Sequence, residues 1–344
     1  MSASDASLRI GLVGFGRLAR DYYLPAFRTL DGGRLVGIAD PLPASRDAAS
    51  DRLPAVEVYP DHRTLFDRAN LDAVIVASSP SSHLEIWNDA ARRGLAVFME
   101  KPFVLCGQLG EVVRGDPAAR LMLDFNRRFW PAYRRMSDGV RAGTVGRPVR
   151  LEYVLHVDVL SWSTVTRHRL SGNDGGILHD LGSHAIDLAA DVVGERPERV
   201  SAATRSERWP GDHLQLDLLF ADGSRAICDL AYETRTFERL SVEGPRGRLR
   251  LADPNMALHF DPDGRRGPGL AASCADAGVF LYRALRRGRS MARFSIASAL
   301  QAFVRAVAAG EPLSPGFDEA VENVRWLEAA ARSAAEGHPA VRAI

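Results

Sequence analysis

The sequence is poor in several features, and each scarcity excludes a class of protein. Its three cysteines, Cys106, Cys228 and Cys274, are scattered without a CxxC pair, which favours free thiols in a reducing compartment over a disulfide framework. No apolar run approaches the roughly 20 residues that are needed to span a bilayer. The segment from Met1 to Ser7 is short and polar and lacks the basic start of a signal peptide. We therefore expect a soluble, cytoplasmic protein without a membrane partner.

An excess of charge of either sign is also missing. The chain has 44 basic and 43 acidic residues, a formal net charge of +1, whereas a dedicated nucleic-acid surface normally needs a marked basic excess. A nucleic-acid partner is therefore not expected. The length of 344 residues, with 46% hydrophobic and 25% charged residues, is typical of a globular protein with two domains.

Lysine is almost absent. Of the 44 basic residues one, Lys101, is a lysine, and the others are arginines. Such a bias usually reflects nucleotide composition. However, an arginine keeps its charge in proteins, whereas a lysine amine can lose its proton when its pKa is lowered. The single lysine therefore either escaped replacement by chance or marks a position where arginine cannot serve.

The first third of the chain alternates short apolar runs with helical patterns. Strands are predicted over residues 8–13, 35–39, 73–77, 96–99 and 121–125, and helix-like stretches such as 82–93 lie between them. Continuous apolar strands separated by helices are typical of a parallel sheet that is covered on both faces. We therefore predict a doubly wound α/β domain of the Rossmann type over residues 1–125.

From about residue 147 the pattern changes to alternating, β-rich segments separated by turn sequences. These segments cover residues 149–157, 199–204, 215–220, 225–232, 239–243 and 248–252. One helix, 177–193, is inserted early, and helical patterns over 294–309 and 317–335 end the chain. We predict an α+β domain over residues 126–344, built on a large, mostly antiparallel, open-faced sheet. The stretch 264–275 is a predicted loop, and the basic run 283–293 is a predicted solvated face or oligomer contact.

A glycine-rich turn follows the first predicted strand. The run Gly14-Phe15-Gly16-Arg17-Leu18-Ala19 places G-x-G-x-x-A before a helix, an arrangement that binds a pyrophosphate at the helix N-terminus. Asp40 ends the second strand, at about the spacing expected of an acid that binds the ribose. The combination predicts a dinucleotide site; the alternative is a structural turn with a loop acid. Asp40 favours NAD, and the nearby Arg46 leaves NADP open.

Two further clusters follow strands of the same predicted sheet. Ser78, Ser79 and His83 come after the strand 73–77, and Glu100 and Lys101 come after the strand 96–99. Ligands of open α/β sheets bind outside the carboxyl ends of the strands, so all five residues are candidate cofactor contacts. At this position the lysine ammonium could bind a substrate hydroxyl. The alternative is a surface lysine in a loop.

The predicted helix 177–193 carries an acid–histidine–acid row. Asp180, His184 and Asp187 fall at positions i, i+4 and i+7, which lie on one face of an α-helix. A histidine near a carboxylate suits proton transfer close to neutral pH. The plainer alternative is an ion pair on a solvated face. Metal binding lacks the support of an HExxH motif or a cysteine cluster, so no metal is expected.

Together these motifs resemble those of the Gfo/Idh/MocA family of NAD(P)-dependent sugar and cyclitol oxidoreductases. The resemblance covers nearly the whole chain and is carried by the segments GLVGFGRLAR, MEKPF, FNRRFWPAYRR and GGILHDLGSHAIDL. The EKP and D-x-x-x-H-x-x-D elements are specific when combined, whereas the glycine motif alone is not. The resemblance implies hydride transfer between a nicotinamide cofactor and a secondary alcohol of a sugar, cyclitol or sugar derivative, nucleotide-linked sugars included.

The resemblance also implies roles for single residues. Lys101 is expected to orient and polarise the hydroxyl, His184 to act as the acid/base, and Asp180 to orient the substrate or the histidine. Asn126 and Arg127, just past the strand 121–125, resemble residues that meet the nicotinamide or the substrate. Members of the family typically form dimers or tetramers through the open face of the second sheet, so a homo-oligomer is expected.

Departures from the family pattern concern which substrate fits. The glycine run before the helix is shortened to Gly175-Gly176, Trp130 stands where a small residue is common, and Trp162 and His168 lie in the variable substrate loop. Of these, Trp162 is a candidate substrate contact. Two rival functions stay open: a glycosidase that uses tightly held NAD for transient oxidation, and a non-catalytic cofactor-binding sensor. The sensor is disfavoured because the lysine and the histidine are both retained.

Overall fold

The computed structural model describes residues 7–116, 119–161, 175–252, 257–262, 291–338 and 340. Trp162, His168, the stretch 264–275 and most of the run 283–293 lie outside the described residues. By its contacts the chain divides into two compact units, Met1–Asn126 with Ala292–Val324 and Arg127–Met291 with Arg325–Ile344. The division adds residues 292–324 to the first unit, and the predicted boundary between residues 125 and 126 stays a prediction.

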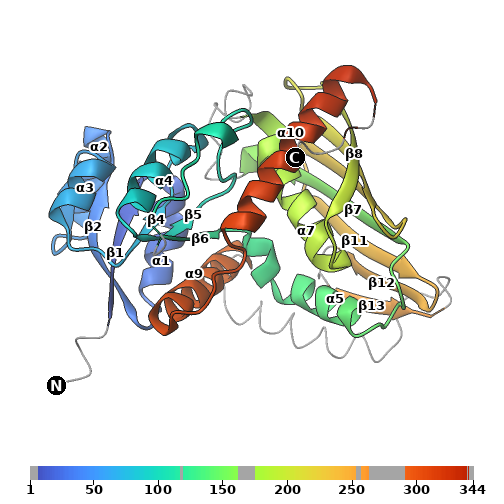
Figure 1. The fold of residues 1–344 in the computed structure, drawn as a ribbon, viewed down its shortest axis with the longest axis horizontal. Coiled ribbons are helices and arrows are strands. Elements are labelled where there is room, and N and C mark those ends of the chain that lie inside the picture. Colours follow the sequence, from blue (N-terminus) through green and yellow to red (C-terminus); the bar gives the residue numbers. More distant parts are fainter. Residues whose placement is uncertain are drawn as a thin grey trace. The chain divides into compact units, whose positions relative to one another are not determined.

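The first unit is built on a parallel sheet of six strands in the order β3-β2-β1-β4-β5-β6 (Figure 1). Its strands are β1 (Leu8–Val13), β2 (Gly33–Ala39), β3 (Glu57–Tyr59), β4 (Ala73–Val76), β5 (Ala96–Met99) and β6 (Arg120–Leu123). The strand order reverses between β1 and β4, and ligands of such sheets bind outside the carboxyl ends at that point. The predicted doubly wound parallel sheet is confirmed, and β3 is a strand that the sequence interpretation did not include.

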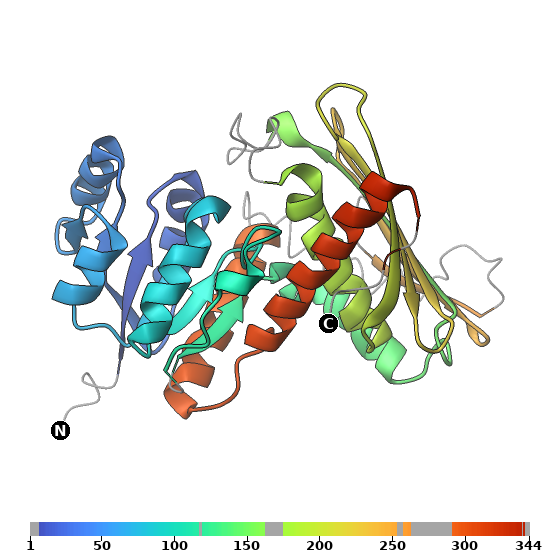
Figure 2. The same cartoon turned by 45° about the horizontal axis from the view of Figure 1, so that its top comes forward.

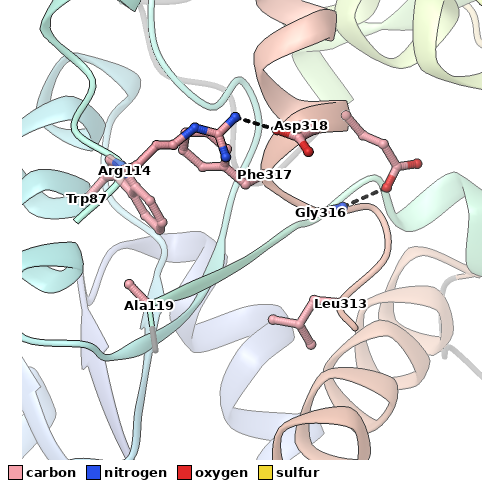
Figure 3. A pocket seen from close by; sticks show the side chains of 8 residues that line it. Trp87, Arg114, Ala119, Leu313, Gly316, Phe317 and Asp318 are labelled. Atoms are coloured by element: carbon pink, nitrogen blue, oxygen red, sulfur yellow. Dashed lines mark hydrogen bonds and ion pairs between the residues drawn. The ribbon is translucent and has the colours of Figure 1, made fainter. Parts of the chain in front are cut away.

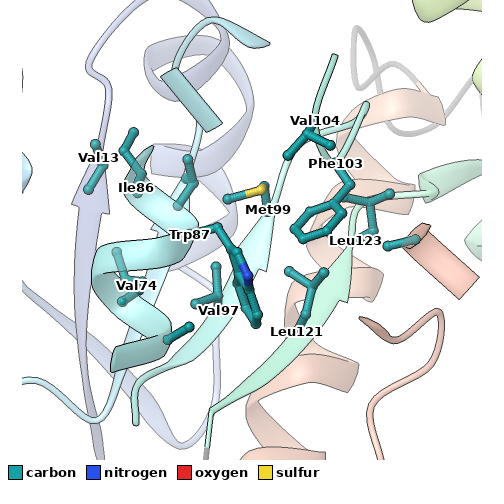
Figure 4. Packing of buried hydrophobic residues seen from close by; sticks show 14 of the residues in the cluster. Val13, Val74, Ile86, Trp87, Val97, Met99, Phe103, Val104, Leu121 and Leu123 are labelled. Atoms are coloured by element: carbon teal, nitrogen blue, oxygen red, sulfur yellow. The ribbon is translucent and has the colours of Figure 1, made fainter. Parts of the chain in front are cut away.

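Helices cover both faces of this sheet. They are η1 (Ala19–Tyr23), α1 (Leu24–Phe27), α2 (Pro43–Arg52), α3 (His62–Arg68), η2 (Pro80–Ser82), α4 (His83–Arg92), η3 (Leu109–Glu111), α9 (Met291–Ala309) and the first turns of α10 (Phe317–Glu336). On one face Trp87 of α4 packs against Phe103, with ring centroids 5.5 Å apart (Figure 4). The Trp87 ring also packs against Phe317 of α10 at 5.4 Å. On the other face Phe98 of β5 packs against Phe303 of α9 at 5.5 Å. The apolar strands are therefore buried on both sides, as their continuous hydrophobic runs require.

The second unit is built on a sheet of seven strands in the order β13-β12-β11-β7-β10-β9-β8. Its strands are β7 (Arg150–Asp158), β8 (Pro197–Arg205), β9 (His213–Phe220), β10 (Arg225–Glu233), β11 (Phe237–Gly244), β12 (Gly247–Ala252) and β13 (Ala257–Asp261). The pairing of β7 with β10 is parallel and the other pairings are antiparallel. The predicted mostly antiparallel sheet is confirmed, with β13 as a further strand.

Helices lie on one face of the seven-stranded sheet (Figures 1 and 2). They are α5 (Pro131–Arg141), η6 (Leu178–Gly182), α7 (Ser183–Val193) and the later turns of α10, with the short helices η4 (Asn126–Phe129) and η5 (Val159–Ser161) near strand ends. Side chains of β7 alternate between buried and half-buried, as expected when one sheet face is covered and the other is open. Within the described part of the chain, no helix is both long and apolar enough to cross a membrane.

Candidate active site

The turn after β1 contains two glycines with different roles. Gly14 has a φ of +93°, and a Cβ at this position would lie 2.6 Å from the backbone oxygen of Ala77, so a larger residue would be strained and would clash with the end of β4. A Cβ on Gly16 would meet nothing within 4 Å among the described residues. The backbone at Gly16 is therefore open to a ligand just before the helical segment that includes η1, where a dinucleotide places its phosphates.

Asp40 closes the carboxyl end of β2 and is buried. Its Oδ2 accepts a hydrogen bond from the Phe15 amide at 2.7 Å, and its Oδ1 accepts one from the Leu42 amide at 2.9 Å. Each carboxylate oxygen keeps a further acceptor position, so ribose hydroxyls can still donate to Asp40. Arg46 donates to the backbone oxygens of Asp40 and Pro41. The open turn and the acid beside it fit a dinucleotide.

His83 connects the loops that follow β4 and β5. Its ring is fully buried, with Nδ1 2.8 Å from the backbone oxygen of Pro102 and Nε2 3.3 Å from that of Ser78. Ser78 Oγ lies 2.8 Å from Ser82 Oγ, and Ser79 is exposed at the same edge. In this structure the histidine joins the two loops through these hydrogen bonds. Its contact with a cofactor stays a prediction.

A buried group of polar side chains lies at the carboxyl ends of β5 and β6, beside the half-buried Lys101. Tyr23, from η1, has its Oη 2.8 Å from Glu100 Oε1 and 3.0 Å from Asp124 Oδ2. Burial, and then the charge of Glu100, raises the pKa of Asp124 well above its ordinary value. The sequence interpretation missed Tyr23 and Asp124. The one available signal was an acid inside the predicted strand 121–125, one residue before its carboxyl end at the ligand-binding edge.

In the second unit, Asp180 lies in a turn of π-helix rather than in a regular α-helix. The π-helical turn η6 leads directly into α7, which carries His184 in its first turn. Asp180 Oδ2 accepts a hydrogen bond of 2.9 Å from Tyr232 Oη of β10. Such turns are frequent at functional sites, and they change the side-chain positions that an α-helical spacing predicts. Tyr232 was missed because it belongs to no sequence motif and contacts Asp180 from a distant strand.

The acid–histidine–acid row is buried rather than solvated. Asp180, His184 and Asp187 are 8%, 9% and 5% exposed, so the alternative of an ion pair on a solvated face does not describe them. Asp187 is bound by the Arg128 guanidinium, with Nε 2.9 Å from Oδ2 and Nη2 2.5 Å from Oδ1. Asp187 is therefore part of a buried ion pair between α7 and η4.

Arg127 and Asn126 begin the short helix η4. The Arg127 guanidinium is buried and forms an ion pair with Glu238 of β11, which also accepts hydrogen bonds from Tyr133 and Tyr153. The rings of Trp130, Tyr133 and Tyr153 surround the guanidinium, at 5.3, 5.8 and 6.0 Å from its Cζ. Asn126 is half-buried. A substrate contact by Arg127 or Asn126 stays a prediction.

A separate cavity lies in the first unit, at the amino end of β6 and therefore away from the strand ends just described (Figure 3). Its volume is about 260 Å³, and Trp87, Arg114, Leu313 and Phe317 are among its lining residues. Arg114 is paired with Asp318 at 2.9 Å across the cavity wall. The cavity contains none of the predicted site residues.

Comparison with known proteins agrees with this geometry. Residues 8–119 match the model of an oxidoreductase family with an NAD-binding Rossmann fold, and residues 133–250 match the Gfo/Idh/MocA C-terminal domain. An inositol 2-dehydrogenase of Burkholderia multivorans is 31% identical, over 72% of this chain and 75% of its own. A D-apiose dehydrogenase of Paraburkholderia graminis is 28% identical, over 77% of this chain and 76% of its own.

Among solved structures, the WlbA dehydrogenase of Bordetella pertussis in complex with NADH and UDP-GlcNAcA superimposes with a TM-score of 0.83. It is 19% identical and the match covers all of both chains, so this likeness concerns the fold. The matches to the two family models and to the inositol 2-dehydrogenase show to which protein family the chain belongs. The chain belongs to the Gfo/Idh/MocA family and is an NAD(P)-dependent oxidoreductase, a dehydrogenase acting on CH–OH groups.

Proposed function

We propose that the protein reversibly oxidises a secondary hydroxyl of a sugar, a cyclitol or a derivative of these, nucleotide-linked sugars included. The observation that carries the proposal is the carboxyl edge of the six-stranded sheet, where the open turn at Gly16 and the acid Asp40 adjoin the strand end that bears Lys101. The substrate class is supported by the inositol 2-dehydrogenase and the D-apiose dehydrogenase among the relatives. A bound nicotinamide supplies the acceptor for the hydride that leaves the substrate carbon.

The residues of the first unit hold the cofactor and the reacting hydroxyl. We assign cofactor contacts to Gly14, Phe15, Gly16, Arg17, Leu18, Asp40, Ser78, Ser79, His83, Glu100 and Lys101. The Lys101 ammonium donates to the substrate oxygen and stabilises the negative charge that develops there as the hydride leaves. Arginine cannot replace it easily, because lysine presents a compact and rotatable donor.

The residues of the second unit handle the proton. His184 accepts the proton of the reacting hydroxyl, which suits an imidazole near neutral pH. Asp180, held by Tyr232, orients the substrate or the histidine. Arg127 and Asn126, the last residue of the first segment of the first unit, contact the nicotinamide or the substrate, and Trp162 contacts the substrate.

NAD is the preferred cofactor in this proposal. A carboxylate at Asp40 repels the 2′-phosphate of NADP, whereas Arg46, held against the same turn, is the group that could attract it. Replacing Asp40 by Ala should weaken binding of NADH more than binding of NADPH, measured by fluorescence titration. Asp47→Ala, an exposed acid on the adjacent helix α2, is the matched control. An unchanged NADH/NADPH ratio in Asp40→Ala would overturn the preference.

We further propose a homodimer or homotetramer that forms through the outward face of the seven-stranded sheet. Apolar side chains on this face, namely Val154, Leu219 and Ile227, are still partly exposed in the single chain. Light scattering after gel filtration tests the assembly. Ile227→Glu should shift the protein to a smaller species, whereas Leu42→Glu, at a residue that is 63% exposed in the first unit, should not. Equal masses for the two variants would place the interface elsewhere.

The decisive experiment follows nicotinamide reduction by the purified protein, with NAD and with NADP, across cyclitols, aldoses, ketoses and nucleotide sugars. We expect turnover with one substrate class. In Lys101→Arg, NADH binding should persist while turnover falls by about 100-fold or more, the range of a lost acid–base or charge-stabilising group. Near-normal rates in Lys101→Arg would remove the lysine from the mechanism. No turnover with any compound, despite tight NADH binding, would contradict the proposed substrate class.

A further inference from the structure

One tyrosine hydroxyl lies between two buried carboxyl groups at the carboxyl edge of the six-stranded sheet. Tyr23 Oη is 2.8 Å from Glu100 Oε1 and 3.0 Å from Asp124 Oδ2. A tyrosine hydroxyl carries one hydrogen, so it can donate to one carboxyl group and must accept from the other. If both groups were ionised, an anionic oxygen would face the lone pairs of the tyrosine inside the protein, which is costly. One of the two carboxyl groups therefore carries a proton.

The surroundings distinguish the two groups. Asp124 is 0% exposed and Glu100 is 8% exposed, so a charge on Asp124 is the more expensive to bury. In addition, Asp124 Oδ1 is buried and has no hydrogen-bond partner among the described residues. Leaving a buried oxygen without a hydrogen bond costs less free energy for the carbonyl oxygen of a neutral acid than for a charged carboxylate oxygen. Burial and the charge of Glu100 also raise the pKa of Asp124. The extra proton thus belongs on Asp124.

We propose that Asp124 is a protonated positioning residue, which donates to Tyr23 Oη while Tyr23 donates to Glu100, so that Glu100 is held as the anion directly before Lys101. The hydrogen-bond chain joins three elements, because Asp124 follows β6, Tyr23 belongs to η1 and Glu100 follows β5. The Asp124 amide is itself fixed by donating to the Met99 backbone oxygen at 2.7 Å. No covalent step is involved.

A neutral Asp124 has an electrostatic consequence, and this part rests on the function proposed above. The acid pair then carries one negative charge, which matches the one positive charge of Lys101, and Lys101 is near enough to act on Asp124 electrostatically. A second negative charge at this sheet edge would oppose the binding of an anionic dinucleotide. The second negative charge would also bind the Lys101 ammonium more tightly. The ammonium would then stabilise less well the negative charge that develops on a substrate oxygen.

Infrared spectroscopy of the cofactor-free protein in D₂O tests the protonation directly and needs no substrate. The difference spectrum between the wild type and Asp124→Asn should contain the carbonyl stretch of a protonated carboxylic acid near neutral pH. Asp72→Asn is the matched control, because the Asp72 carboxylate is paired with Arg9 at 2.7 Å and should contribute no such band. If the difference spectrum contains carboxylate bands and no band of a protonated acid, Asp124 is ionised and the proposal is overturned. This outcome does not depend on which substrate the enzyme uses.

The kcat/KM values of variants and their dependence on pH test the positioning role. An Asn at position 124 can still donate to Tyr23, so Asp124→Asn should keep kcat/KM within about threefold of the wild type and flatten any pH dependence that Asp124 causes. Tyr23→Phe removes the hydrogen bond to the charged Glu100, and Asp124→Ala removes the donor that positions Tyr23, so both should lower kcat/KM by about tenfold or more. An equal loss in Asp124→Asn and Asp124→Ala would show that the charge of Asp124 is needed, contrary to the proposal. If the wild type oxidises no sugar or cyclitol, the proposed function fails, while the infrared result still decides the protonation.

Discussion

At the scale of single residues, two aspartates of the first unit show how surroundings decide the charge of identical side chains. Asp72 accepts hydrogen bonds from the side chain and amide of Arg9, and the side-chain bond above all lowers the pKa of Asp72. Asp124 lies in the interior beside Glu100, and burial raises its pKa. Neither behaviour can be predicted from the sequence, because the partners are distant along the chain or are created by burial itself.

The two aspartates should therefore affect stability in opposite ways as the pH changes. A carboxyl group whose pKa is higher in the folded than in the unfolded protein stabilises the folded state at pH values below the unfolded-state pKa of about 3.9. This contribution to the free energy of unfolding is lost as the pH rises towards the folded-state pKa. Asp124→Asn has no such group, so its stability relative to the wild type should increase as the pH rises above about 4. Asp72→Asn loses a group with a lowered pKa and should be less stable than the wild type above about pH 4.

Urea unfolding at several pH values measures both differences. The stability of Asp124→Asn minus that of the wild type should increase with pH, while the deficit of Asp72→Asn should shrink only at acidic pH. A difference for Asp124→Asn that does not change with pH would mean that Asp124 has the same pKa in the folded and unfolded states.

At the scale of elements, strongly patterned segments could be predicted and weakly patterned ones could not. The strands β1 and β5 have the predicted bounds, because β5 is a continuous apolar run and β1 is interrupted by a single charged residue, Arg9, before a turn signal. Strand β3 has three residues, of which one is buried, so its sequence carries little pattern. The π-helical turns η1 and η6 were also missed, since their apolar spacing over five residues does not differ clearly from that of an α-helix.

For the candidate site, the sequence identified residues that belong to motifs, whereas the structure added those that contact them. The turn at Gly14, Asp40 and the helix start near Asp180 are local features, which short spacings predict. Tyr23, Asp124, Tyr232 and Glu238 contact site residues across long sequence separations. Such contacts are made by the tertiary fold, and a single sequence carries no signal for them.

The glycine turn gives a prediction with a built-in control. Gly14→Ala should destabilise the protein by about 1–3 kcal/mol, because its φ of +93° is strained for alanine and its Cβ would meet the Ala77 backbone. Gly16→Ala has room for a Cβ, so its stability should stay within about 1 kcal/mol of the wild type. That methyl group would nevertheless stand where the backbone approaches the pyrophosphate, so NADH affinity should fall by about tenfold or more. Gly16→Ala with unchanged NADH affinity would move the phosphates away from this turn.

The ion pair between Arg127 and Glu238 should contribute mainly to stability. Arg127→Met would leave a buried carboxylate without its cation, which costs about 3–5 kcal/mol. Adding Glu238→Gln removes that charge and leaves an oxygen that can accept from Tyr133 and Tyr153, so the double variant should recover part of the loss. Chemical unfolding of the wild type, the single variants Arg127→Met and Glu238→Gln, and the double variant gives the coupling free energy between the two residues. If Arg127→Met instead raises KM at unchanged stability, Arg127 acts as the substrate contact that the sequence predicts.

At the scale of the whole molecule, the chain returns to its first unit after forming most of the second. Phe303 of α9 packs on Phe98, and Phe317 of α10 packs on Trp87, so both faces of the six-stranded sheet are completed by residues from near the end of the sequence. Helical periodicity shows that a segment has an apolar face, but not which sheet that face covers. The sequence therefore predicted the two terminal helices without predicting their partners.

This arrangement predicts which fragments of the chain can fold. A protein of residues 1–126 alone would expose the surfaces around Phe98 and Trp87, and it should aggregate or bind hydrophobic dyes without a cooperative unfolding transition. The same fragment joined by a flexible linker to residues 292–324 regains Phe303 and Phe317, so it should unfold cooperatively in urea and bind NADH. Phe303→Asp in the joined protein is the control, because a charge at this fully buried position should abolish both properties. If residues 1–126 alone unfold cooperatively and bind NADH, the last helices are dispensable for the cofactor unit, and their packing stabilises a fold that the first 126 residues already specify.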